Sequence, residues 1–328
     1  INNIKRLQCI RETDLNASYI QTSDIDASGT SEWNNGNGFK PIGEGLNTKT
    51  PFNGAFDGQG YNITGLTVDR GSEDFVGLFG SIGGMGKLTN VSVLNASITG
   101  DSIVGVLTGD NTNGTISESH VAGSVEGSDL VGGLVGSSIR GEISKSYMTG
   151  SVNASLAAGG LVGFNLFGSK VSKSYAVGSV NGTRNVGGLI GVNRQATVSE
   201  SYATASANGT ENVSALVGKN AFGEVVTSYA TGPVSGNRNV GGLLGANDLN
   251  DGSSIIRSYW DTEATGQTSS PEGTGLTTSE MTGSAATENM TGFDFTGTWE
   301  AVTNPDDYPV LAWQTEEDEG NSTDLAPD

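Results

Sequence analysis

Short apolar segments recur along the chain at a nearly constant spacing, with polar and glycine-rich stretches between them. Elements of the GLVG type mark the period, and their last glycines are 27 to 29 residues apart, at Gly80, Gly109, Gly136, Gly163, Gly191, Gly218 and Gly245. Each apolar segment has four to six residues and is rich in Val, Ile and Tyr, which favours a strand over a helix. The pattern predicts a unit of about 27 residues that occurs seven times.

Further positions repeat in register with these glycines. An aromatic position comprises Val93, His120, Tyr147, Tyr175, Tyr202, Tyr229 and Tyr259, and an apolar one comprises Leu78, Leu107, Leu134, Leu161, Leu189, Leu216 and Leu243. Such a period is typical of a solenoid, in which each unit packs against its neighbours. We therefore predict an all-β fold, a parallel β-helix of about seven 27-residue coils, each with three short strands and three turns.

Polar residues also recur in register. One row lies two residues after the marker glycines and comprises Asn111, Ser138, Asn165, Asn193, Asn220 and Asn247, and a shorter row comprises Asn185, Asn212 and Asn239. Identical amides about 4.8 Å apart can bond to each other along a stack, so we interpret both rows as structural ladders. The aromatic position has two interpretations, a structural column or a sugar-binding strip formed by Tyr175, Tyr202 and Tyr229.

The units divide the chain into four parts. Residues 1–73 are expected to form an N-terminal capping segment and first coil, 74–266 the repeats, 267–314 a C-terminal cap over the last coil, and 315–328 an acidic tail. Tryptophans near the two ends are candidates for cap or end-to-end contacts: Trp33, Trp260, Trp299 and Trp313. Contact between unlike ends does not close on itself, so it would produce a head-to-tail homo-oligomer.

The elements GGLVG, GGLIG and GGLLG resemble the GLUG repeat of secreted adhesins and of bacterial or archaeal surface proteins. The stretch FNGAFDGQGYNITGLTV, residues 52–68, is similar to the segment that precedes such repeats, and SYWDTEATG with DDYPVLAWQ resembles the closing segment. Ser214 and Ala215 depart from the repeat pattern where glycines are usual. The resemblance implies an extracellular, right-handed β-helix.

Composition restricts the possible partners. The net charge is −20, and residues 267–328 carry 13 acidic and no basic side chains, which disfavours binding to nucleic acid or to an anionic membrane. The single cysteine, Cys9, excludes an internal disulfide, and no apolar stretch is long enough to cross a membrane. Because the chain begins at Ile1 rather than Met, we expect it to be processed or part of something longer.

The sequence offers little catalytic chemistry. His120 is the only histidine, which excludes an H-E-x-x-H zinc site, and it occupies the aromatic position of its unit. Its neighbour Ser119 is expected to point to the opposite face of a strand, so the two do not suit a catalytic triad. Residues 80–89 are glycine-rich but lack the pattern of a phosphate-binding loop. We predict that the protein is not an enzyme and has no cofactor.

One candidate metal site and one kind of candidate modification site remain. Asp24, Asp26 and Ser28 have the alternation of a calcium loop, although an ordinary Asp-rich turn explains them as well. Eleven N-x-S/T sequons are glycosylation candidates, at Asn16, Asn62, Asn90, Asn95, Asn113, Asn153, Asn181, Asn208, Asn212, Asn289 and Asn321. Three of these asparagines recur at one corner of successive coils, where crowding predicts partial occupancy: Asn153, Asn181 and Asn208.

These observations predict an extracellular or cell-surface structural protein, either an adhesin or a filament subunit. Its expected partners are other copies of the chain or the surface glycans of another cell. The alternatives are a β-helix that binds or cleaves carbohydrate and a non-catalytic domain of a larger secreted protease.

Overall fold

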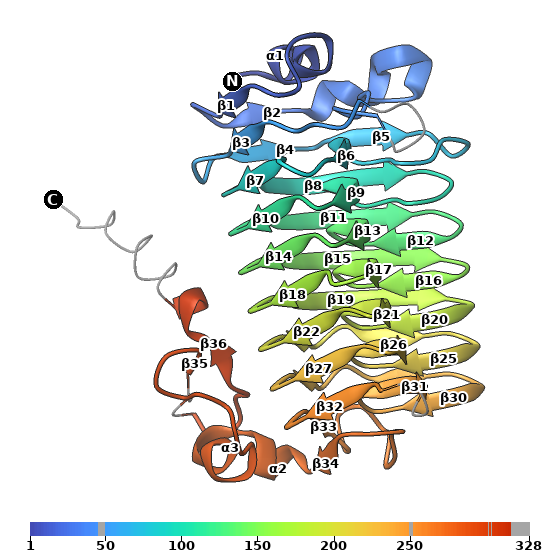
Figure 1. Ribbon diagram of the computed structural model, residues 1–328, viewed down its shortest axis with the longest axis vertical. Coiled ribbons are helices and arrows are strands. Elements are labelled where there is room, and N and C mark those ends of the chain that lie inside the picture. Colours follow the sequence, from blue (N-terminus) through green and yellow to red (C-terminus); the bar gives the residue numbers. More distant parts are fainter. Residues whose placement is uncertain (45–49, 249–251, 301, 303, 316–328) are drawn as a thin grey trace, which may run out of the picture.

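A computed structural model describes residues 1–44, 50–248, 252–300, 302 and 304–315. The chain winds into a stack of coils, with the N-terminal helix at one end and a C-terminal segment folded alongside the other (Figure 1). All strand pairs within the stack are parallel, with registers that connect each coil to the next, as between β15 (Tyr147–Ala154) and β19 (Tyr175–Gly182). The predicted parallel β-helix is confirmed.

Strands of successive coils form four sheets. The first sheet has nine strands, β1 (Ser18–Ile20), β3 (Ala55–Asp57), β7 (Lys87–Thr89), β10 (Thr115–Ser117), β14 (Glu142–Ser144), β18 (Lys170–Ser172), β22 (Thr197–Ser199), β27 (Glu224–Val226) and β32 (Ser254–Ile256). The second has thirteen, β2 (Ile25–Asp26), β4 (Asn62–Thr64), β5 (Thr67–Asp69), β8 (Ser92–Thr99), β11 (His120–Glu126), β15, β19, β23 (Tyr202–Ala203), β24 (Ser206–Asn208), β28 (Tyr229–Ala230), β29 (Val234–Ser235), β33 (Tyr259–Asp261) and β34 (Thr274–Leu276).

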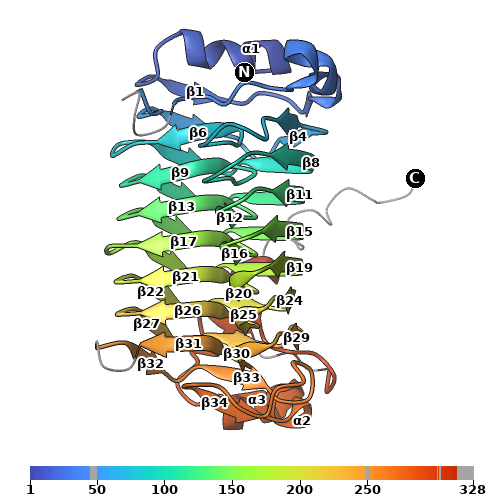
Figure 2. The ribbon, with the colours of Figure 1, turned by 90° about the vertical axis from the view of Figure 1, so that its right-hand side faces the viewer.

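The other two sheets of the solenoid are joined by the two residues just before the marker-glycine strands, such as Gly160 and Leu161. The third sheet comprises β12 (Leu130–Gly132), β16 (Ala157–Gly159), β20 (Arg184–Gly187), β25 (Glu211–Ser214) and β30 (Arg238–Gly241). The fourth comprises β6 (Phe79–Ile82), β9 (Thr108–Thr112), β13 (Val135–Ile139), β17 (Val162–Leu166), β21 (Ile190–Arg194), β26 (Val217–Ala221) and β31 (Leu244–Asp248). The seven strands of the fourth sheet correspond to the seven predicted coils (Figure 2).

The expectation of three strands per coil is wrong, because a Gly-Gly bend divides one side of the coil. Between β16 and β17, Gly160 lies so close to the next coil that an added Cβ would be 2.1 Å from the carbonyl oxygen of Gly188. Gly133 makes the same approach to Gly160 one coil earlier. The backbone therefore turns sharply inside the GGLVG element, and its leucine points into the core.

One continuous apolar core runs through the stack. All seven residues of the predicted Leu position are fully buried, which confirms them as core. At the aromatic position, however, β8 contributes Ser92 opposite His120, and Val93 pairs instead with the buried Val121. The inclusion of Val93 in the aromatic column was therefore wrong by one residue.

Both ends of the stack are covered. At the first end lie α1 (Ile4–Cys9) and the 3₁₀ helix η1 (Ile10–Glu12), whose Leu7 and Ile10 are buried in the main core. A longer 3₁₀ segment, η2 (Ser28–Gly36), follows β2. At the other end the backbone N–H of Gly242 donates to Ser269, and the indole of Trp260 donates to the carbonyl of Gln267. Together with the pairing of β33 and β34, these contacts cover part of the strand edge of the last coil.

The C-terminal segment does more than cap the last coil. After β34 it forms α2 (Thr278–Met281), α3 (Gly283–Asn289) and an antiparallel pair of β35 (Trp299–Glu300) and β36 (Val310–Leu311). We call residues 277–315 the strap. Figure 1 shows β35 and β36 beside the coils rather than beneath them. The strap thus runs back along the side of the solenoid, contrary to the expected position over its end.

Candidate functional site

The aromatic residues predicted from the period form one continuous stack on the outside of the second sheet. Neighbouring ring centroids from His120 to Tyr229 are 4.7–5.0 Å apart and nearly parallel, with interplanar angles of 2–6°. This spacing is that of hydrogen-bonded strands, so each coil contributes one ring at the start of its strand. We call these residues the tyrosine column: His120, Tyr147, Tyr175, Tyr202, Tyr229 and Tyr259.

The strap covers much of the tyrosine column. Trp299 is buried and lies 5.5 Å from Tyr229 and 6.1 Å from Tyr202, measured between ring centroids. Phe293 packs edge-on against Tyr259 at 5.7 Å, and Trp313 lies 5.9 Å from Tyr175. Column and strap together form a second apolar cluster, separate from the core inside the coils.

Several polar groups of this cluster are paired, whereas the indole N–H of Trp299 is buried without a hydrogen-bond partner among the described residues. The hydroxyl of Tyr229 donates to the carbonyl of Pro309 at 2.6 Å, and that of Tyr259 donates to the carbonyl of Thr291 at 3.0 Å. The indole of Trp313 donates to the carbonyl of Lys173 at 3.0 Å. Burial raises the pKa of Tyr202 to about 12 and places the pKa of Tyr229 well above its ordinary value. The burial thus favours the neutral form of Tyr202 and Tyr229.

The predicted sugar-binding strip is closed by this packing. Tyr202 and Tyr229 retain only 6% and 1% of their exposure, and Tyr175 is partly buried beneath Trp313. A sugar ring needs one open aromatic face, which these residues do not provide while the strap is in place. The prediction of a sugar-binding strip on these tyrosines is therefore wrong. The column is instead the surface on which the strap packs.

His120 is confirmed as a member of the column. Its ring stacks on Tyr147 at 4.8 Å with an interplanar angle of 4°. Burial lowers its pKa below the ordinary value of 6.5. The neighbouring Ser119 is buried, and its hydroxyl donates to the carbonyl of Ser117 at 2.8 Å. The two side chains therefore serve separate structural contacts.

A row of serines was missed by the sequence analysis, although its signal, the S-x-S-Y pattern, was visible. In each coil the residue just before the second serine of this pattern has a positive φ, for example 49° at Lys173. The next serine, Ser174, accepts a hydrogen bond from the backbone N–H of Ser146 at 3.1 Å and donates to the carbonyl of Ser172 at 2.7 Å. We call this row the serine ladder: Ser119, Ser146, Ser174, Ser201, Ser228 and Ser258.

The shorter asparagine ladder is confirmed, and the longer one is confirmed from Asn165 to Asn247, whereas Ser138 bonds to Ser169 instead of to Asn165. Asn193 donates to Asn220 and accepts from Asn165, each at 2.9 Å, and all three are fully buried. In the shorter row, Asn212 bonds to Asn185 at 2.7 Å and to Asn239 at 2.8 Å. These amides bond to copies of themselves and so are used within the scaffold.

The sequons differ in their exposure. Five of the asparagines are exposed, Asn16, Asn95, Asn113, Asn153 and Asn208, and four are partly buried, Asn62, Asn90, Asn181 and Asn289. Asn212 is 8% exposed and part of a ladder, so the folded chain does not present it for modification. Asn321, like residues 316–328 of the expected acidic tail, lies outside the described residues. At the predicted crowded corner, Asn181 donates to Asn153 at 3.1 Å and Asn208 donates to Asn181 at 3.3 Å.

The calcium candidates are occupied by backbone contacts. Asp24 accepts from the N–H of Asn62 at 2.8 Å, and Asp26 accepts from the N–H of Ser28 at 2.9 Å. Hydrogen bonds with the side chain of Ser28 and then with its backbone lower the pKa of Asp26. Among the described residues, no group of three or more His, Cys, Asp or Glu side chains is placed to hold a metal ion. The segment is built as an Asp-rich turn.

Charged side chains form ion pairs between coils. Lys145 lies 3.9 Å from Glu118, and Lys173 lies 3.6 Å from Glu200, all four being substantially exposed. Such pairs contribute little to stability, about 0–1 kcal/mol each. Their alternation along one corner corresponds to a solvated face rather than to a cluster of catalytic groups.

Known proteins share both the sequence and the fold of these coils. No protein-family model matches the chain. The chain is similar to part of a halomucin. That protein, from Haloquadratum walsbyi, is 42% identical over 128 residues, which are 38% of this chain and 1% of the halomucin. A Gly-rich membrane protein of Evansella cellulosilytica is 40% identical over 79 residues, 23% of this chain and 9% of that protein.

The halomucin similarity covers a small part of a much longer protein, as does the second match. A crystal structure from Bacteroides ovatus, described as an immunoglobulin A1 protease, superposes on 95% of this chain and 91% of its own with a TM-score of 0.56. At 18% identity this likeness establishes the fold alone. The comparisons thus relate the chain to proteins of a surface type. In the part of the chain that the structure describes, no helix is long and apolar enough to span a membrane.

Proposed function

We propose that this chain is a rigid, non-catalytic module of an extracellular or cell-surface protein, of the kind that holds other parts of a large molecule at a fixed distance. The observation that carries the proposal is the internal use of its polar groups. In the described coils the asparagine and serine ladders bond to their own copies in adjacent coils, as Asn193 and Ser174 do. The repeated side chains therefore serve rigidity rather than reaction chemistry.

Similarity to segments of a halomucin and of a Gly-rich membrane protein supports placement at a cell surface. The nine strands of the first sheet span about 38 Å at roughly 4.8 Å per step. Apolar side chains fill the interior along that length, which resists bending. An adhesive role would use the sides of this rod.

The covered ends favour a discrete rod over a filament subunit. Leu7 of α1 is buried over the first coil, and Ser269 accepts a backbone hydrogen bond at the last one. Open strand edges, which promote end-to-end pairing, are thereby reduced. Head-to-tail assembly, expected from the sequence, remains the alternative result of the experiment below.

The test combines location and assembly. Antibody labelling of intact producing cells is expected to detect the chain without permeabilisation, and a cytosolic location would contradict the proposal. Sedimentation of the purified chain over a wide concentration range is expected to give the monomer mass of 33.5 kDa. Polymers that lengthen with concentration would support the filament subunit instead.

A further inference from the structure

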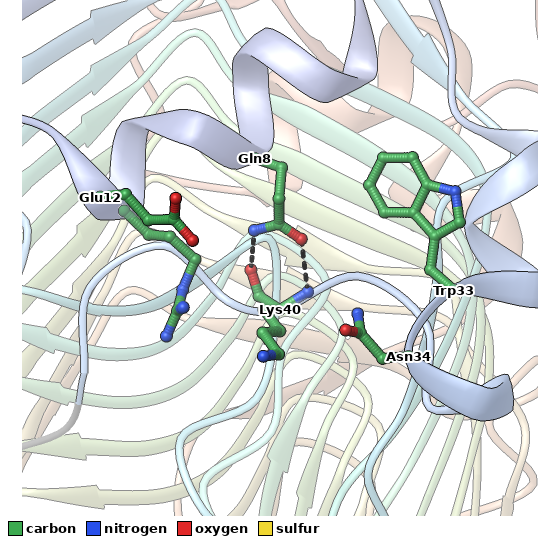
Figure 3. Close-up of a pocket in the computed structure, with 6 residues that line it drawn as sticks. Gln8, Glu12, Trp33, Asn34 and Lys40 are labelled. Atoms are coloured by element: carbon green, nitrogen blue, oxygen red, sulfur yellow. Dashed lines mark hydrogen bonds between the residues drawn. The ribbon is translucent and has the colours of Figure 1, made fainter.

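A small hollow lies at the N-terminal end, on elements outside the repeat. Its volume is about 310 Å³. Its walls are formed by α1, η1 and η2 and by Lys40. Figure 3 shows Glu12 on one side, Trp33 and Asn34 on the other, and a hydrogen-bonded pair between them. We call this site the cap pocket, lined by Gln8, Arg11, Glu12, Trp33, Asn34 and Lys40.

The floor of the cap pocket is fixed by hydrogen bonds. Gln8 donates through Nε2 to the carbonyl of Lys40 at 2.8 Å, and its Oε1 accepts from the N–H of Lys40 at 2.9 Å. Asn34 donates to the carbonyl of Gly38 at 2.7 Å. Asn34 and Asn35 both have left-handed backbone conformations, with φ of 54° and 60°, which turn the chain just after Trp33. The hollow therefore exists before any ligand arrives.

The walls present an aromatic face and groups of both charges. Trp33 is partly buried and packs against the main core, which fixes its ring. The guanidinium of Arg11 is 3.7 Å from the carboxylate of Glu44, too far for a hydrogen bond, so this ion pair uses none of its five N–H donors. Lys40 and Glu12 are exposed. A ligand in the pocket thus meets donors, an acceptor and an indole ring together.

This combination selects the chemistry of the ligand. A carboxylated ligand would face the carboxylate of Glu12, and a cationic one would face Arg11 and Lys40. A hydroxyl group both donates and accepts, so a polyhydroxyl ligand uses charges of both signs. The C–H face of a sugar ring supplies the apolar surface that an indole packs against. The volume is at the lower end of ligand pockets, about 300–1,000 Å³, which limits the ligand to a small unit.

We propose that the cap pocket binds one pyranose unit of a neutral oligosaccharide or polysaccharide, with the ring against Trp33. Hydroxyl groups of the sugar donate to Glu12 and accept from Arg11 or Lys40. This inference goes beyond the proposed function, since a rigid module requires no ligand. It also places carbohydrate binding on the cap, away from the tyrosine column that the strap covers.

The experiment follows the four indole N–H signals of the full chain by NMR during titration with maltotriose, cellotriose, mannotriose and trigalacturonate. Trp33→Phe identifies the signal of Trp33. We expect at least one neutral trisaccharide to shift that signal with a millimolar Kd. Trp33→Ala should abolish binding, and Glu12→Gln should weaken it about tenfold, the value of one charge-assisted hydrogen bond.

A matched control separates the pocket from general aromatic exposure. Phe222 is an exposed aromatic residue of the solenoid, and Phe222→Ala should leave binding unchanged. Because Glu12 is exposed, Glu12→Gln is expected to fold normally even if Trp33→Ala does not. The proposal is overturned if no neutral trisaccharide shifts the Trp33 signal, if Glu12→Gln binds as tightly as the unchanged chain, or if only trigalacturonate binds.

Discussion

Asp110 is a buried carboxyl group whose hydrogen bonds are only partly satisfied. It lies in β9 and is 1% exposed. Its Oδ2 accepts from Thr112 at 2.7 Å and from Ser81 at 3.4 Å, whereas its Oδ1 is buried with no partner among the described residues. Burial is the main influence, and it raises the pKa of this carboxyl above its ordinary value of 3.8.

We predict that Asp110→Asn raises the thermal midpoint of unfolding at pH 7. A raised folded-state pKa means that the ionised carboxylate destabilises the folded chain above the unfolded-state pKa, and a neutral amide removes that cost. The gain should shrink as the pH falls toward 3.8 and vanish below it, because both states are then protonated. Calorimetry at pH 7 and pH 3 provides the measurement. Glu126→Gln, at an exposed site, is the control, and a variant less stable at both pH values would refute the prediction.

At the scale of elements, the period predicted most contacts that link identical residues. A residue that recurs every 27 residues must lie beside its copies, so the Asn193 row and the aromatic column followed from spacing alone. The Gly-Gly bend did not follow, since glycine in a strand and glycine at a turn look alike in sequence. The serine ladder was missed for a related reason: its geometry depends on the left-handed conformation of the preceding residue, such as Lys173.

We predict that Ser174→Ala lowers the free energy of unfolding by about 1–3 kcal/mol, because it leaves the buried N–H of Ser146 without its acceptor. Ser179→Ala is a matched control, since Ser179 lies in the same strand but is partly exposed, and it should change stability by no more than about 0.5 kcal/mol. Urea unfolding of both variants gives the comparison. Equal stability of the two variants would show that the ladder contributes nothing measurable.

At the scale of the whole molecule, the repeated sequence predicted the solenoid but not the course of the strap. Residues 277–315 have no period that relates them to the coils, and Trp313 contacts Lys173, which is 140 residues away in the chain. The sequence alone predicts Trp299 and Trp313 at an end of the rod, because only the ends of a solenoid are expected to need covering. In the structure the rings of the tyrosine column create a second apolar surface on its side, and the strap buries that surface.

Because the apolar side chains of the strap pack on the tyrosine column and not in the core inside the coils, we predict that the strap can detach while the solenoid stays folded. Trp299→Ala removes a buried ring whose centroid is 4.7 Å from that of Phe293, a loss of about 3–5 kcal/mol that falls on the strap cluster. Hydrogen exchange should then quicken in residues 277–315, while the strands of β13 and β17 keep their protection. Phe222→Ala, at an exposed ring, should leave both regions unchanged. If exchange quickens in the coils to the same degree, the strap and the solenoid form a single cooperative unit.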